Sequence, residues 1–303
     1  MAPGDSPTIA RRRVRLALRE ARESAQLTQQ QVADAMEWSL SKVIRIEAGD
    51  VSIAPNDLRP LLGYLGIKDR SRIDELTRDA KIARTRQRRA WYQAPEYREH
   101  LSDASRRLIE FEAEAEAIRY YMFYFIPGPL QTPEYAAALL AKFEDEMPPE
   151  QIRVRLEARR HRREALLARL GTVKIYALLD ESVLMRPLGG AEVFGAQLQE
   201  LQRLATARLV NIRMVPFSLD APLTNNAGFD LLSLTEGDEQ SQVVYRESGF
   251  LDELVEDRAS TSRHHNRFDK VWHVARDEAN TTAFIQGRIE TLRASIAEQH
   301  QNS

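Results

Sequence analysis

The sequence predicts an α/β protein of two domains, in which a small all-α domain of five helices precedes a larger mixed α/β domain. Apolar residues recur at helical spacing in the first 83 residues, between capping and glycine signals. From Val173 onward, short runs typical of strands are interspersed with further helical patterns. A chain of 303 residues is long enough to bury a core in each part. Helices that alternate with strands favour a layered domain whose sheet is partly parallel.

The composition excludes several classes of chemistry. The chain has no cysteine, which rules out disulfides, thiol catalysis and cysteine-ligated zinc. Its 29% charged and 43% hydrophobic residues are typical of a globular protein. No apolar run approaches the roughly 20 residues that cross a bilayer, and residues 1–10 lack the apolar centre of a signal peptide. We therefore expect a soluble cytoplasmic protein with no membrane partner.

The net charge of -2 hides an asymmetry along the chain. Residues 1–90 contain 18 Lys and Arg against 12 Asp and Glu, a net of +6. The rest contains 25 basic and 33 acidic residues, a net of -8. A nucleic acid should therefore meet the first 90 residues and be repelled by the rest. The alternative is an ordinary solvated charged surface.

Two short helices joined by a tight turn fit residues 28–49. Thr28 followed by Gln31 is a capping-box pattern, which predicts a helix start. Val32, Ala33 and Met36 then share one apolar face.

The second helix of the pair has its own start and stop signals. Ser39 is placed to cap it, and Gly49 stands where a helix end favours a left-handed residue. Val43, Ile46 and Glu47 share its inner face. An ordinary amphipathic helix pair is the alternative interpretation of both helices.

A helix–turn–helix places its second helix in the DNA major groove while the first lies across the backbone. The outer face of the second helix carries Ser41, Ile44, Arg45 and Ala48, with Leu40 and Lys42 at its leading end. We expect base reading from Arg45 and phosphate contacts from Lys42 and, at the start of the first helix, Gln29. Arg45 has a structural alternative, which is an ion pair with Glu47 or with an acidic group of the first helix. The predicted DNA-contacting residues are Gln29, Ser39, Leu40, Ser41, Lys42, Ile44 and Arg45.

The stretches Leu27–Met36 and Ser39–Gly49 resemble the lambda-repressor-like helix–turn–helix of xenobiotic-response-element regulators. The resemblance implies a five-helix DNA-binding domain and double-stranded DNA as the partner. Glu37 stands where that family usually has a turn glycine, so the turn should be strained or reshaped. Leu40 stands where many relatives have a polar base reader, which implies an apolar contact such as one to a thymine methyl group.

The flanking segments complete the first domain. We expect a disordered tail at 1–10, the DNA-binding domain at 11–83, a linker at 84–104 and the α/β domain at 105–298. Asn56 should cap a helix that has Pro60 in its first turn, and a further helix should follow from Ser71. The basic run Arg84–Arg89 is a helix end or a linker.

In the second domain the patterns predict a strong helix from Ser105 through Arg119, an aromatic cluster at Tyr120–Phe125, and a helix start at Thr132. Further helices are predicted at Pro149–Leu170, Ala191–Ala207, Leu254–Asp277 and Thr281–Glu298. Strands are predicted at Val173–Asp180, Leu209–Phe217, Gly228–Leu234 and Gln242–Arg246.

Four segments of this domain resemble a domain of unknown function that follows the helix–turn–helix in many actinobacterial regulators. The segments are Phe111–Tyr120, Ile126–Ala136, Leu178–Pro187 and Asn211–Phe217. Such proteins are called antitoxin-like transcriptional regulators, and they often accompany a small acidic partner protein. The resemblance implies a regulator without supplying a ligand.

No catalytic constellation and no metal or cofactor motif emerges from the sequence. Asp180 and Glu181 are adjacent at a strand end and point to opposite faces, which suits acid–base work poorly. His264, His265 and His273 share one predicted helix but lack an i, i+4 ligand pair with a carboxylate. We therefore expect no enzyme, no cofactor and no metal.

A ligand pocket is one interpretation of the aromatic and proline-rich turn. Arg119, Tyr121 and Gln131 border it, and aromatic walls with a few polar groups suit small molecules. A packed hinge between helices is the favoured alternative.

Together these patterns indicate a dimeric, sequence-specific transcriptional regulator, whose second domain dimerises and senses a small-molecule effector or a partner protein. The alternative is an interaction module that sequesters a small partner, with DNA binding secondary. A third hypothesis is an enzyme fused to a DNA anchor, for which the sequence offers no catalytic constellation.

Overall fold

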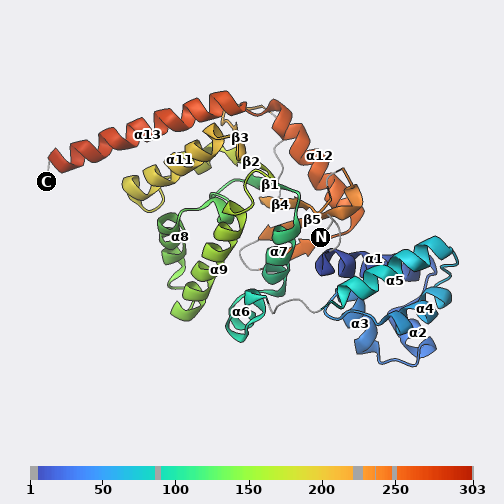
Figure 1. Cartoon of the computed structure of the whole chain (residues 1–303). Coiled ribbons are helices and arrows are strands. Elements are labelled where there is room, and N and C mark those ends of the chain that lie inside the picture. The colour runs from blue at the N-terminus through green and yellow to red at the C-terminus, as the bar shows by residue number, and fades with distance from the viewer. Residues whose placement is uncertain (1–5, 86–89, 221–227, 236, 248–250, 302–303) are drawn as a thin grey trace. The chain divides into compact units, whose positions relative to one another are not determined.

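The structure is a computed structural model that describes residues 6–85, 90–220, 228–235, 237–247 and 251–301. The chain divides into two compact units, of which the first ends at Ala90 and the second begins at Trp91. Figure 1 shows the first unit as helices alone and the second as helices around a sheet. An all-α domain followed by a mixed α/β domain is therefore confirmed.

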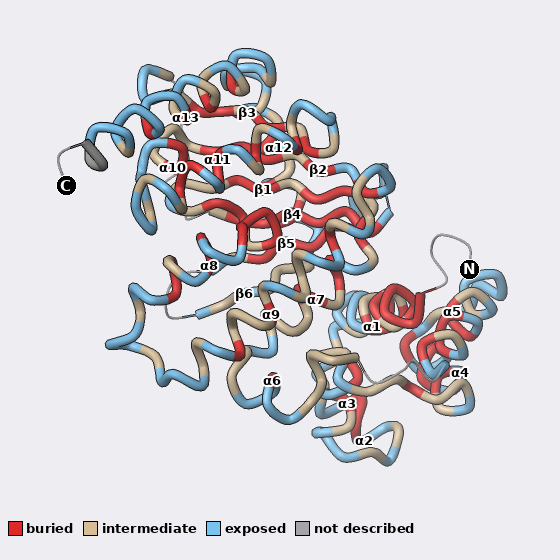
Figure 2. The backbone as a smooth tube through the Cα atoms, turned by 60° about the vertical axis from the view of Figure 1, so that its left-hand side comes forward, coloured by how far each residue is buried: buried red, intermediate tan, exposed pale blue. Residues whose placement is uncertain are grey.

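The first unit consists, in its described part, of the five expected helices. They are α1 (Pro7–Ser24), α2 (Gln29–Ala35), α3 (Leu40–Ala48), α4 (Pro55–Tyr64) and α5 (Arg70–Ala83). Each presents one apolar face to a shared core that includes Leu18, Val32, Val43, Leu62 and Leu76. Figure 2 shows the buried residues of these helices in red.

The local signals of the helix pair are confirmed at atomic detail. The Thr28 hydroxyl accepts from the Gln31 backbone N–H at 3.2 Å, and the Gln31 side chain accepts from the Thr28 N–H at 2.8 Å. Ser39 caps α3, and Gly49 ends it with a φ of +87°. Glu37 has a φ of +55°, so the turn that usually has a glycine holds a residue in the left-handed region.

Two boundaries in the first unit differ from expectation. Ser6 caps α1, whose first residue is Pro7, so residues 7–10 are helical rather than a disordered tail. α4 begins at Pro55 rather than after Asn56, which puts Pro60 inside the helix and beyond its first turn. Proline has no N–H to donate there, so α4 lacks one of its backbone hydrogen bonds. Residues 86–89 of the predicted basic run lie outside the described residues.

The second unit begins earlier than expected. The segment predicted as a linker contains the 3₁₀ turn η1 (Trp91–Gln93) and α6 (Pro95–His100), and both belong to this unit. Trp91 and Tyr97 stack edge to face with a centroid distance of 4.8 Å. Part of the segment predicted as a linker is therefore packed through these aromatic rings.

The remaining helices of the second unit follow in chain order. They are α7 (Asp103–Glu114), η2 (Gly128–Leu130), α8 (Pro133–Leu140), η3 (Ala141–Phe143), α9 (Pro149–Leu167), α10 (Glu181–Met185), α11 (Gly190–Thr206), η4 (Glu239–Ser241), α12 (Arg258–Val274) and α13 (Glu278–Gln301).

The described strands form one sheet of six in the order β3-β2-β1-β4-β5-β6. They are β1 (Ala117–Met122), β2 (Lys174–Asp180), β3 (Asn211–Val215), β4 (Phe229–Ser233), β5 (Gln242–Glu247) and β6 (Asp252–Val255). The pairs among β1, β2 and β3 are parallel, whereas β4, β5 and β6 join antiparallel. The expectation of a partly parallel sheet is confirmed.

Two strands were absent from the prediction. The helix expected to continue through Arg119 ends at Glu114, and β1 begins three residues later at Ala117. Leu254 was assigned to a helix but lies in β6, and α12 begins at Arg258.

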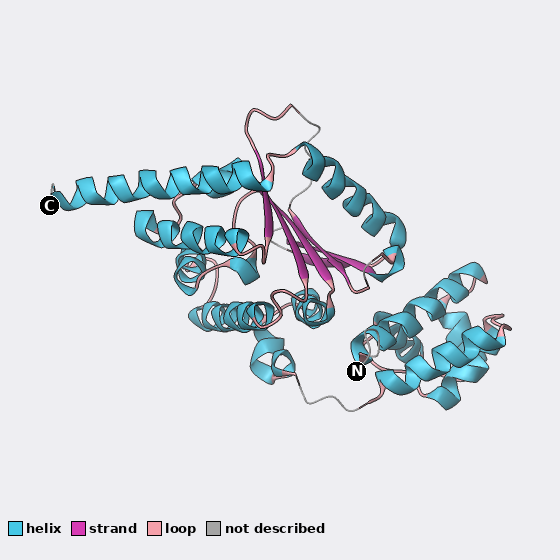
Figure 3. Cartoon of the chain, turned by 45° about the horizontal axis from the view of Figure 1, so that its top comes forward, coloured by secondary structure: helices cyan, strands magenta, loops and turns pink. Residues whose placement is uncertain are grey.

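Helices cover both faces of the sheet (Figure 3). On one face, Tyr121, Phe229 and Val244 pack against Phe268 and Val271 of α12. On the opposite face of the same strands lie Tyr120, Asp230 and Tyr245, which are direct cross-strand neighbours. The face under α12 therefore holds an apolar cluster, and the opposite face carries a row of polar side chains.

Candidate DNA-binding surface

The inner side of α3 is held by a polar network that links three helices. Glu47 of α3 accepts from Arg22 of α1 at 2.7 Å and from the Gln29 side chain of α2 at 2.8 Å. Arg22 also donates to the Leu27 carbonyl at 2.9 Å. The Glu47 hydrogen bond and charge raise the pKa of Arg22. This network fixes α3 against the two helices that precede it.

The outer side of α3 is exposed and carries the predicted base-reading residues. Leu40 and Ile44 are 38% and 43% exposed, whereas Val43 and Ile46 on the inner side are 3% and 4% exposed. Ser41 and Arg45 are exposed as well. Within the described part of the chain, the Arg45 side chain makes neither a hydrogen bond nor an ion pair, and Glu47 is bound to Arg22 instead. The Arg45 guanidinium is therefore available to a ligand.

Lys42 has partners inside the domain. Its ammonium lies 2.9 Å from the Asp57 carboxylate of α4 and 3.7 Å from the centre of the Trp38 ring. The Ser39 hydroxyl accepts from the Lys42 backbone N–H at 3.2 Å. Asp57 was not singled out from the sequence, because its meeting with Lys42 depends on how α4 packs. Trp38, only four residues before Lys42, was not singled out either. The capping role of Ser39 was the part that local spacing revealed.

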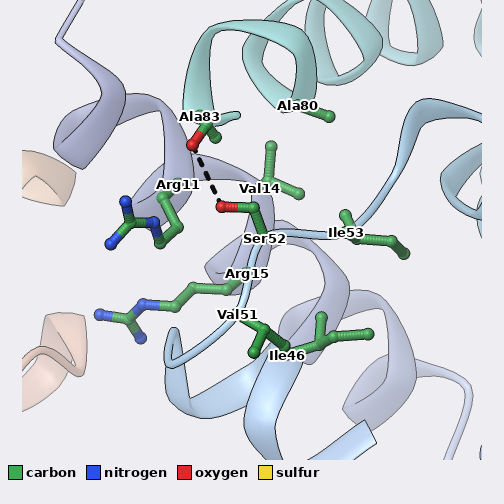
Figure 4. Close-up of a pocket in the computed structure, with 9 residues that line it drawn as sticks. All are labelled: Arg11, Val14, Arg15, Ile46, Val51, Ser52, Ile53, Ala80 and Ala83. Atoms are coloured by element: carbon green, nitrogen blue, oxygen red, sulfur yellow. Dashed lines mark hydrogen bonds between the residues drawn. The ribbon is translucent and has the colours of Figure 1, made fainter. Parts of the chain in front are cut away.

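A shallow pocket lies beside α3 in the first unit (Figure 4). Figure 4 shows apolar side chains around a hydrogen bond of 3.1 Å from the Ser52 hydroxyl to the Ala83 carbonyl. The residues lining this pocket are Arg11, Val14, Arg15, Ile46, Val51, Ser52, Ile53, Ala80 and Ala83. None of the predicted DNA-contacting residues lines it.

The three residues predicted to border a ligand pocket each contact different partners. Arg119 stacks over the Tyr176 ring at 5.1 Å and donates to Ser233 at 3.3 Å. Tyr121, two residues along β1, is buried in the apolar core under α12, and burial raises its pKa to about 12. Gln131 is buried after η2, where its side chain donates to the Ile126 carbonyl at 2.8 Å. Each residue is thus engaged in local packing.

The two carboxylates at the end of β2 also have structural partners. Asp180 caps α10 by accepting from the Ser182 N–H at 2.9 Å. Glu181 accepts from the Phe217 N–H at 2.8 Å, which ties the ends of β2 and β3 together. Among the described residues, no group of three or more His, Cys, Asp or Glu side chains is placed to hold a metal ion.

Comparison with known families agrees with this division of the chain. Residues 14–76 match a model described as a helix-turn-helix domain, and residues 105–287 match a domain of unknown function, DUF5753. The molecule is therefore a helix–turn–helix protein. Because the second match covers more than half of the chain, it belongs to the DUF5753 family. No curated protein and no solved structure matches it.

Helices in the described ranges were also compared with the requirements of a membrane span. None is both long and apolar enough to cross a bilayer.

Proposed function

We propose that this protein is a sequence-specific transcriptional regulator that binds double-stranded DNA through α3. The observation that carries the proposal is the exposed face of α3, where Arg45 has no partner in the described chain and Leu40 and Ile44 are unusually exposed for apolar residues. A helix of nine residues, held from behind by the Glu47 network, can enter a major groove without rearranging.

The contacts divide by chemistry. Arg45 has the fork of donors that matches the acceptor edge of guanine, and Ser41 adds an adaptable hydroxyl. Leu40 and Ile44 are suited to the methyl group of thymine. Ser39 flanks this face at the helix start.

Phosphate contacts come from the edges of the same surface. The Lys42 ammonium has three donors, and Asp57 and the face of the Trp38 ring do not occupy all of them, so it can also donate to a phosphate. Gln29 lies at the first position of α2, where the positive end of the helix dipole favours an anion. These contacts position the helix without reading sequence.

A dimer follows from the size of the reading surface. One helix contacts only a few base pairs, whereas two helices related by two-fold symmetry read half-sites about 34 Å apart. The second unit, whose net charge is negative in sequence, is unsuited to the DNA backbone. We therefore assign dimerisation and the sensing of an effector to that unit.

The test is a selection of binding sites from a pool of random duplexes by the full-length protein, with its mass measured by light scattering. We expect a two-fold symmetric site and a dimeric mass. Arg45→Ala should lose preference at one position of each half-site, while Arg19→Ala on the exposed side of α1 should select the same site. Failure of the wild-type protein to enrich any sequence would contradict the proposal.

A further inference from the structure

The face of the sheet that lies opposite α12 holds an unusual set of side chains. Tyr120 of β1 is opposite Asp230 of β4, and Asp230 is opposite Tyr245 of β5. Directly opposed side chains lie on the same face of a sheet. We call these three residues the polar row; Tyr120, Asp230 and Tyr245 are 0%, 6% and 8% exposed, respectively. Buried positions at the middle of a sheet are usually apolar, since each buried polar group needs a partner.

One arginine next to the polar row has a carboxylate partner. Arg162 of α9 donates through Nε and Nη2 to the two oxygens of Glu112 of α7, both at 2.7 Å. The two helices pack against each other (Figure 1). Burial, with a smaller contribution from the Glu112 charge, raises the pKa of Asp230 to about 8. Asp230 is therefore mostly neutral at pH 7 and does not balance a second cation.

Further arginines on the same side of α9 have no such partner. Arg155 and Arg159 precede Arg162 by seven and three residues, a spacing that puts all three on one side of a helix. In the described part of the chain, neither the Arg155 nor the Arg159 side chain makes a hydrogen bond or an ion pair, and the Nε atom of each is buried. Burial lowers the pKa of Arg159 to about 10. The Glu247 charge opposes this shift in part, and repulsion from Arg162 and Arg155 adds to it, so the guanidinium stays charged at neutral pH.

The acidic groups on this side do not neutralise the two arginines. Glu112 is bound to Arg162, and Glu247 at the end of β5 is exposed and outside ion-pair distance of both. The Tyr120 hydroxyl is fully buried and also lacks a hydrogen-bond partner in the described chain. A partly buried cation without a counter-charge is destabilising unless a ligand supplies one.

We propose that Arg155 and Arg159 form a binding site for a small oxyanion, the carboxylate or phosphate group of a low-molecular-weight ligand, at the α9 side of the polar row. Guanidinium groups bind both kinds of oxyanion through paired N–H donors. Both side chains are partly exposed, so an anion reaches them from solvent. This inference rests on the second unit alone and is independent of DNA binding.

The experiment is a thermal-unfolding titration of the full-length protein with inorganic phosphate and, separately, with acetate, against chloride at equal ionic strength. We expect one of the two anions to raise the melting temperature along a saturating curve, which identifies the oxyanion. Arg159→Met should weaken the apparent affinity at least tenfold. Arg160→Met is the matched control, because Arg160 is exposed on the same helix and pairs with Glu164, and it should keep the wild-type curve.

A second readout separates a binding site from a structural arginine. In chloride alone, Arg159→Met should melt no lower than the wild-type protein, because the change removes an unpaired charge and keeps much of the apolar stem. The proposal is overturned if Arg159→Met melts well below the wild type in chloride. It is equally overturned if neither anion stabilises the wild type, or if wild type and Arg159→Met respond alike, which would place the anion elsewhere on the protein.

Discussion

Arg22 and Glu47 meet in a two-point ion pair, in which Nε lies 2.7 Å from Oε1 and Nη2 lies 3.0 Å from Oε2. The two side chains are only 12% and 8% exposed. They are 25 residues apart in sequence and join α1 to α3. The orientation of the proposed reading helix therefore depends on a carboxylate that faces away from DNA.

Removal of that carboxylate should uncouple α3 from α1. We expect Glu47→Gln to lower the free energy of unfolding by roughly 3 kcal/mol, because Arg22 would remain mostly buried without its counter-charge. Affinity for every DNA sequence should fall with it. Urea unfolding measures the first effect, and Glu23→Gln, at a carboxylate 54% exposed beside Arg22, is the control that should change stability little. Wild-type stability for Glu47→Gln would show that the pair contributes nothing.

Arg45 and Lys42 should differ in how their loss affects binding. Arg45→Ala should cost about 1–3 kcal/mol at one base position and relax the preference there. Lys42→Ala should weaken all sequences alike and lower the slope of log affinity against log salt by about 1. Binding to a set of operator variants at several salt concentrations measures both. If Arg45→Ala weakened every variant equally and also lowered the melting temperature, Arg45 would be structural.

The exposed pair Leu40 and Ile44 should make binding sensitive to a methyl group. Replacing thymine by uracil in the half-site removes the C5 methyl and leaves the hydrogen-bonding groups unchanged. We expect a loss of about 0.8 kcal/mol for each methyl contact, measured by competition between the two duplexes. Leu40→Ser with Ile44→Ser should no longer distinguish them. Equal wild-type affinity for both duplexes would show that the two side chains do not touch thymine.

Two glycines of the first unit should respond to alanine in opposite directions. Gly49 has a φ of +87°, and a Cβ atom there would lie 2.8 Å from Arg15 Cδ. Gly49→Ala should therefore cost about 1–2 kcal/mol of stability from backbone handedness. Gly63 lies within α4, and beyond its chain neighbours and the nearby backbone of its own helix no atom lies within 4 Å of the position of a Cβ, so Gly63→Ala should gain about 0.5–1 kcal/mol. Denaturant midpoints that moved in the same direction would contradict the argument.

The pKa of Asp230 predicts a pH dependence. The folded pKa of about 8 lies far above the unfolded value of about 3.9. The folded state thus binds the extra proton, and stability falls as the pH rises from about 4 to about 8, by up to about 1.4 kcal/mol per pH unit. The Asp230→Asn variant has no carboxyl group there and should not lose this stability as the pH rises. Its stability relative to wild type, from urea unfolding at several pH values, should rise up to about pH 8 and then level off. Parallel curves would contradict the raised pKa.

Local interactions were predictable from the sequence because their partners are close together in it. The pairing of Thr28 with Gln31, the Ser39 cap and the left-handed Gly49 all span at most a few residues. The exposed face of α3 followed from the same spacing. By contrast, the contact of Lys42 with Asp57 depends on how two helices pack, which no local pattern specifies.

The missed strands have a physical explanation as well. β1 lies between β2 and β4 and is buried on both faces, so its residues do not alternate between apolar and polar. Its sequence therefore looked like a continuation of the helix before it. β6 has only four residues, which is too short for a periodic signal. The unpaired arginines of α9 were equally hidden, since an Arg-rich helix in sequence resembles any solvated helix.

The position of β1 between two distant partners affects how the chain folds during synthesis. β1 is paired with β2, and its other neighbour contains Ser233, which lies opposite Ala117. The first unit is complete once Ala90 has been made, whereas the centre of the sheet must wait for more than a hundred further residues. At typical translation rates that delay is on the order of ten seconds. The helix–turn–helix therefore finishes folding on the ribosome while its companion unit still exposes an unpaired central strand.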